Sequence, residues 1–143
     1  VYTMSEENKA IVRRWVVEGF NTGNPAIADE IIDPSFKYHH PGFPPVPSGP
    51  EGYKQLVAMY RGAFPDLNIT MEDMIAEGDK VVARWTAQGT NTGEMMGMPP
   101  TGKTFKAPGM NMFRINGGKV AEVWTSFDDL GMMQQLGIIP TPG

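Results

Sequence analysis

The 143-residue sequence contains no cysteine. Disulfides and thiolate metal sites are therefore excluded, and a reducing cytoplasm is compatible with the chain. Lysine and arginine are also fewer than aspartate and glutamate, 12 against 16, which gives a net charge of −4. A negative surface repels phosphate backbones and anionic lipids, so we expect neither nucleic acid nor a membrane as a partner.

Long apolar runs are missing as well. No run approaches the roughly 20 residues that span a bilayer, and the N-terminal residues lack the basic region and apolar core of a secretory signal. A cytoplasmic location is the expectation. Met4, followed by Ser5, Glu6 and Glu7, is typical of a natural start, so residues 1–3 are expected to be an extension outside the fold.

The familiar catalytic motifs are absent too. The sequence has no glycine-rich phosphate loop, no nucleophile elbow and no spacing typical of metal ligands. We therefore expect no cofactor and no metal. What is present is ordinary globular composition, with 41% apolar and 20% charged residues. A chain of this length has room for one hydrophobic core, which predicts a single domain over residues 1–143.

The first half of the chain has helical periodicity. Apolar side chains recur every three or four residues from Ser5 to Asn21 and again between Ser48 and Pro65, and a short helix is predicted from Asn24 to Ile32. Between the last two helices, residues 36–40 predict a short strand. Residues 41–47 contain four prolines and are expected to form a loop, with a lid as one possible role.

After this half the apolar period changes from 3.6 to 2. Four alternating rows follow, separated in two places by glycine turns, which predicts an antiparallel meander. The rows are Leu67 to Met71, Val81 to Ala87, Phe105 to Ile115 and Ala121 to Phe127. A short helix is predicted from Asp128 to Leu136. Helices followed by a sheet indicate the α+β class, as a cone-shaped curved antiparallel sheet with three helices covering its open side.

The second face of this sheet is unusually apolar. Met110, Met112 and Trp124 lie on it among charged neighbours. Large apolar patches on soluble proteins usually mark contacts, so we predict a homodimer through the outer sheet face.

The two histidines, His39 and His40, are adjacent and must point to opposite faces of a strand. His40 shares its parity with Phe36 and Tyr38, which favours it as the inward-pointing candidate, with His39 as the alternative. A purely structural histidine at a cavity edge stays equally open.

Asn111 is a lone amide on a strand face otherwise formed by Phe113 and Ile115. A buried amide must find partners, so Asn111 either holds a ligand carbonyl or bonds to its protein neighbours. Thr125 would lie on the same face and could add a hydroxyl.

Asp128 and Asp129 follow the last strand, where a carboxylate either caps the terminal helix or faces the mouth of the cone. Apolar residues that would bind a small hydrophobic ligand, or else belong to the core, are Trp15, Val16, Phe20, Trp85, Met98 and Phe113.

These motifs together resemble the SnoaL-like polyketide cyclases over nearly the whole chain. The matching pieces are FNTGN, FKYHHP, SGPEGYKQLV, AFPDLNITMEDMIAEGDKVVARWTAQGT, TGEMMGMPPTGK and QQLG. The resemblance implies the cone-shaped, cystatin-like α+β barrel that ketosteroid isomerases also share. It also implies an acid–base residue on the last strand that closes a ring by aldol condensation. That family aspartate falls at Thr125 here, and a family histidine falls at Asn111.

A comparison with ketosteroid isomerases implies a different set of residues. Their base precedes a proline in the first strand, which is similar to His40-Pro41, and their oxyanion-hole acid falls at Asn111. Their catalytic tyrosine falls near Val16. A histidine base facing an amide donor would suit removal of a proton next to a carbonyl.

Three hypotheses follow. The first is a cofactor-independent isomerase, cyclase or lyase acting on a small hydrophobic carbonyl or polycyclic compound, with His40 as base, Asn111 as oxyanion donor and Asp128 as an orienting or acid group. The second is a non-catalytic carrier or sensor of an apolar molecule. The third is an epoxide hydrolase-like enzyme, disfavoured because Arg114 has the outer parity.

Overall fold

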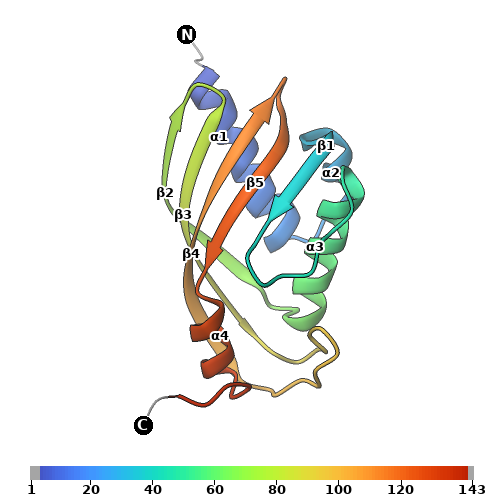
Figure 1. Cartoon of the computed structure of the whole chain (residues 1–143), viewed down its shortest axis with the longest axis vertical. Helices are drawn as coiled ribbons and strands as arrows, with labels where there is room; N and C mark the ends of the chain where they lie inside the picture. Colours follow the sequence, from blue (N-terminus) through green and yellow to red (C-terminus); the bar gives the residue numbers. More distant parts are fainter. Residues whose placement is uncertain (1–3, 142–143) are drawn as a thin grey trace.

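The structure, a computed structural model, describes residues 4–141, so the expectation for residues 1–3 lies outside the described residues. Three helical regions precede the meander and a fourth follows it (Figure 1). The helical elements are α1 Met4–Arg14, η1 Trp15–Asn21, η2 Pro25–Ile27, α2 Ala28–Ile31, α3 Pro50–Ala63 and α4 Asp129–Gln135. The strands are β1 Ile32–His39, β2 Asn68–Glu77, β3 Lys80–Thr90, β4 Thr104–Asn116 and β5 Lys119–Phe127.

The strands form one strongly curved sheet in the order β1-β5-β4-β3-β2. The pairs from β2 to β5 are antiparallel, as the alternating rows predicted, and their glycine turns have the positive φ that tight hairpins require, at Gly78, Gly117 and Gly118. β1 joins the edge of this meander in parallel with β5. The first three helical regions lie across one side of the sheet, which confirms the predicted α+β class, and α4 lies at one end beside β4 (Figure 1).

The first helix differs from the uninterrupted helix that the periodicity predicted. The α-helix ends at Arg14, and residues Trp15–Asn21 continue as a π-helix. Beside this segment the Tyr53 hydroxyl donates a hydrogen bond of 2.6 Å to the Trp15 carbonyl. Gly19 makes this approach possible, since a Cβ at Gly19 would lie 1.6 Å from the Tyr53 hydroxyl. π-Helical turns are frequent at functional sites, and this one carries three side chains toward the sheet.

The first strand is longer than predicted and the preceding helix is shorter. We expected the strand from Phe36 to His40, but β1 begins at Ile32 and ends at His39. The Asp33-Pro34 pair therefore lies inside the strand. Pro34 has no N–H to donate, and it falls between Ile32 and Lys37, where the pairing with β5 is irregular. His40 is consequently the first residue beyond the strand.

The core lies between the helices and the inner face of the sheet. Its centre is Trp15, whose ring lies 4.5 Å from the ring of Tyr53 and 5.3 Å from that of Phe113. Aromatic rings at these separations stabilise a core beyond the free energy of burying their area. This cluster holds the π-helix against both α3 and the sheet.

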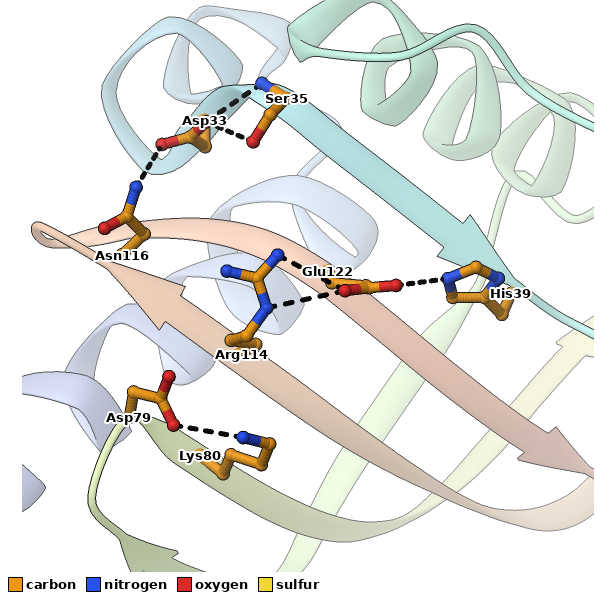
Figure 2. Close-up of polar contacts among 8 residues, drawn as sticks. All are labelled: Asp33, Ser35, His39, Asp79, Lys80, Arg114, Asn116 and Glu122. Atoms are coloured by element: carbon orange, nitrogen blue, oxygen red, sulfur yellow. Dashed lines mark hydrogen bonds and ion pairs between the residues drawn. The ribbon is translucent and has the colours of Figure 1, made fainter.

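The outer face of the sheet carries an ionic network (Figure 2). Nε2 of His39 on β1 lies 2.6 Å from one oxygen of Glu122 on β5, and the Arg114 guanidinium on β4 contacts the other oxygen at 3.2 Å. The His39 ring also stacks on Trp124, with ring centroids 5.5 Å apart. Met110 on the same face is exposed. The homodimer through this face stays a prediction.

Among residues 4–141, no helix is both long and apolar enough to cross a membrane.

We predict that Gly109→Ala destabilises the protein. Gly109 lies between Trp85 and Phe127 on neighbouring strands, and the two rings stack 5.3 Å apart across it. A Cβ at Gly109 would lie 2.3 Å from the Trp85 ring. The free energy of unfolding should fall by about 1–3 kcal/mol, measured by urea denaturation. The matched control is Gly62→Ala in α3, where a Cβ meets nothing within 4 Å, and stability should rise by up to about 1 kcal/mol. Equal stability of both variants would contradict this packing account.

A second prediction concerns pH. The hydrogen bond from His39, followed by that from Arg114, lowers the pKa of Glu122. Because the folded pKa is lowered, the stabilisation is present above the ordinary glutamate pKa of about 4.5 and disappears as pH falls through the lowered value. His39→Ala should raise the Glu122 pKa in a carboxyl NMR titration. Arg114→Gln removes the weaker of the two hydrogen bonds to Glu122, so it should raise the Glu122 pKa less than His39→Ala does. A larger rise for Arg114→Gln would show that His39 is not the main cause of the lowered pKa.

Candidate functional site

An apolar cavity lies between the helices and the inner face of the sheet. The space inside it is about 540 Å³ when open solvent at the mouth is included. The lining residues are Trp15, Val16, Phe20, Tyr38, His40, Tyr60, Leu67, Ile69, Trp85, Ala87, Phe105, Asn111, Thr125 and Phe127. Few of them are polar, so each polar group has a large effect on what the cavity binds.

His40 lies in the wall of this cavity. Its side chain is only 2% exposed, and its Nε2 lies 2.6 Å from Oδ2 of Asp129. Its Nδ1 lies 3.0 Å from the Tyr38 hydroxyl. The Phe43 ring covers one face of the imidazole, with ring centroids 4.9 Å apart and an angle of 14° between the planes. The imidazole is therefore held on three sides.

The two aspartates after β5 have different positions. Asp128 is the N-cap of α4, where its Oδ1 accepts a hydrogen bond of 2.9 Å from the Gly131 backbone. Asp129, the next residue, pairs with His40. Successive residues at a helix start point in different directions, so when one aspartate caps the helix the other is free to contact His40. The carboxylate beside the histidine is thus Asp129, whereas the sequence favoured Asp128 as the candidate.

Asn111 and Thr125 form the second polar feature of the cavity. They are paired across β4 and β5, and both are 7% exposed. Among the described residues, Asn111 Oδ1 and Thr125 Oγ1 have no hydrogen-bond partner. A buried polar atom without a partner costs about 1–3 kcal/mol. These two atoms therefore favour a ligand that brings polar groups to this end of the cavity.

Tyr38 and Tyr60 were not among the sequence-based candidates, yet both line the cavity. Burial raises the pKa of Tyr38 above its ordinary value, and burial likewise raises the pKa of Tyr60. The Thr125 hydroxyl partly offsets the rise for Tyr38, although no hydrogen bond of standard geometry joins the two groups. The signal available in the sequence was the parity that Tyr38 shares with His40. Both phenols are protonated at neutral pH.

The other candidates divide into two groups. Trp15, Val16, Phe20 and Trp85 line the cavity, but Phe113 lies in the core beneath it, 1% exposed. Met98 pairs with Met95 in a small bridge and is not among the lining residues. His39 is on the outer face, bonded to Glu122 (Figure 2).

A second cavity adjoins the first and shares His40 and Tyr60 with it. Five methionines line it, together with part of the residue 41–47 loop: Met59, Met95, Met96, Met132 and Met133. Phe43 from that loop stacks on both His40 and Tyr60 at the boundary. Flexible thioethers adapt to apolar ligands of different shape, so this cavity extends the apolar space past His40. A lid role for the loop stays a prediction.

Within residues 4–141, no group of three potential metal ligands is close enough to hold an ion. The described groups provide instead a carboxylate–imidazole pair, two phenols, an amide and a hydroxyl. This set can accept a proton and donate hydrogen bonds to a developing negative charge.

Comparison with known proteins agrees with this architecture. The chain is 32% identical over 125 residues to nogalonic acid methyl ester cyclase of Streptomyces nogalater, covering 85% of this chain and 92% of the relative. It is 34% identical over 137 residues to the aklanonic acid methyl ester cyclase AcmA of Streptomyces galilaeus, covering 94% and 92%.

A solved structure of a SnoaL-like polyketide cyclase from Jannaschia sp. CCS1 superposes with a TM-score of 0.85 at 27% identity, covering 96% of each chain. The family model for SnoaL-like polyketide cyclases matches residues 10–136. Since this match spans most of the chain and the relatives so named are cyclases, the protein belongs to the SnoaL-like polyketide cyclase family.

Proposed function

We propose that the protein is a cofactor-independent enzyme of the cyclase type that removes a proton from the carbon next to a carbonyl group in an apolar, multi-ring compound. The observation that carries the proposal is the buried His40, paired with the half-exposed Asp129, in the wall of a largely apolar cavity. A histidine paired with a carboxylate is a typical proton acceptor at neutral pH. The family relationship supports cyclase-type chemistry, and the site supplies the residues.

The proposed step begins when the C–H bond next to the carbonyl breaks, with His40 as the base that gains a proton. The electron pair moves into the carbonyl, so negative charge develops on the carbonyl oxygen. The Asn111 amide, whose oxygen has no partner among the described residues, has a nitrogen that can donate to the carbonyl oxygen. Asp129 stabilises the imidazolium that forms. The enolate carbon then attacks a second carbonyl of the same molecule and closes a ring, or it regains a proton at another position.

The lining of the two cavities supports the substrate class. Aromatic and aliphatic side chains form most of the first cavity, and methionines form much of the second. The cyclases to which the chain is similar are named for aklanonic acid methyl ester and nogalonic acid methyl ester. We therefore propose multi-ring methyl esters of this kind as the first compounds to test.

A non-catalytic carrier or sensor is the second candidate. The observation that favours it is the pair Asn111 and Thr125, neither of which ionises, at the positions where the family resemblance implies a histidine and an aspartate. The buried His40 with its partner Asp129 favours the enzyme, because a carrier of apolar molecules has no need for a proton acceptor.

We predict that the protein catalyses deuterium exchange in D₂O at the carbon next to the carbonyl of 2-tetralone, measured by mass spectrometry. We also predict that it closes a ring in aklanonic acid methyl ester. His40→Ala should slow exchange about 100-fold or more, because it removes the proton acceptor. Asn111→Ala should slow it by about 10²-fold, because the oxyanion loses a donor.

The matched control is His39→Ala, which removes the same ring from the outer face and should leave the exchange rate unchanged. Tight binding of these compounds without exchange or ring closure would favour the carrier. If His40→Ala catalysed exchange at the wild-type rate, His40 would not be the base.

A further inference from the structure

Both ring nitrogens of His40 are already engaged within the protein. Nε2 lies 2.6 Å from Asp129 and Nδ1 lies 3.0 Å from the Tyr38 hydroxyl. Phe43 stacks on one face of the ring, and the side chain is 2% exposed. No ring nitrogen is therefore left to contact a ligand in the cavity directly.

The chemistry of the partners determines where the protons are. An ionised carboxylate only accepts hydrogen bonds, so the contact with Asp129 places a proton on Nε2 of His40. In a neutral imidazole the other nitrogen is then an acceptor, and the Tyr38 O–H donates to Nδ1. Carboxylate, imidazole and phenol thus form one chain of hydrogen bonds, in which each group orients the next.

Tyr38 and His40 both line the cavity, but of the two only the phenol oxygen keeps free lone pairs. Tyr38 lines the cavity, and its hydroxyl is close enough to Thr125 for that group to affect its pKa. Burial raises the Tyr38 pKa, so the phenol stays protonated before the reaction. Because its one proton is donated to His40, the lone pairs of its oxygen remain available on the side of the cavity where Asn111 and Thr125 lack partners.

We propose that Tyr38 is a catalytic residue that carries the proton between the ligand and His40. The inference rests on the proposed function. As the C–H bond of the ligand breaks, its proton moves to the Tyr38 oxygen, and the former phenol proton moves to Nδ1 of His40. The electron pair passes to the ligand carbonyl oxygen, and the imidazolium remains beside Asp129. The reverse transfer returns a proton to the product, and no free phenolate accumulates in the apolar cavity.

The arrangement uses a general rule of proton transfer. A group that accepts a proton must lie within hydrogen-bond reach of the atom that loses it. Direct contact of the ligand with His40 would require the ring to leave Asp129 or the Tyr38 hydroxyl to leave Nδ1. Transfer through Tyr38 requires neither movement.

The test is Tyr38→Phe, assayed by deuterium exchange into 2-tetralone. The catalytic constant should fall about 100-fold or more, while KM changes by no more than about twofold because the ring is retained. Nitrogen NMR should show that Nδ1 of His40 has lost a hydrogen-bond donor. The matched control is Tyr53→Phe, which removes a buried, hydrogen-bonded phenol hydroxyl outside the cavity and should keep the exchange rate.

A second variant separates proton transfer from positioning. Tyr38→3-fluorotyrosine keeps the hydroxyl and its hydrogen bond but makes the phenol more acidic. The exchange rate should change about threefold or more if the phenol moves the proton. It should not change if the hydroxyl only holds His40 in place, and that result would overturn the proposal.

The outcomes for the two proposals differ. If Tyr38→Phe exchanges at the wild-type rate while His40→Ala does not exchange, Tyr38 is not the carrier of the proton and the proposed function stands. If the wild-type protein catalyses no exchange, the proposed function fails and the role of Tyr38 fails with it.

Discussion

The parallel pairing of β1 with β5 is the constraint on which the site depends. Parallel strands end at the same edge of a sheet, so the residues that follow them in the chain meet there. His40 is the first residue after β1, and Asp129 begins the helix that follows β5. The two side chains are 89 positions apart in sequence and 2.6 Å apart in space. Tyr38, two residues before His40, lines the same cavity and completes the chain of hydrogen bonds.

The cavity combines this polar chain with apolar walls. Water is largely displaced from such a space, so a hydrogen bond or charge in it has a stronger effect than at the surface. The unpartnered Asn111 and Thr125 lie across from the chain on the inner face of the sheet. A hydroxyl group of a ligand at this end could donate a hydrogen bond to either oxygen. The outer sheet face has its own histidine, His39, whose partners are ionic and solvent-exposed, so adjacent histidines have unrelated environments (Figure 2).

Much of the fold was predictable because periodicity reports local geometry. The change from period 3.6 to period 2, together with the glycine turns, predicted the helices, the meander and the inward rows. The π-helix at Trp15–Asn21 was not predictable, since it depends on Tyr53 approaching Gly19 from another element. The start of β1 at Ile32 was missed for a related reason. Pro34 suggested a break in regular structure, but β1 is an edge strand, and its irregular pairing with β5 tolerates the proline.

For the site, the sequence by itself determined which groups were available: one inward histidine, one buried amide, one hydroxyl on the same sheet face and two aspartates at a helix start. Side-chain parity follows from the backbone alone, so it needed no knowledge of the neighbours. Only the tertiary structure decided which aspartate meets His40, because Asp128 caps the helix and Asp129 is then free to contact His40. It alone also revealed that both nitrogens of His40 are occupied and that Tyr38 lines the cavity beside it, because the contact with Asp129 spans 89 residues and depends on how the strands pair and not on any local pattern.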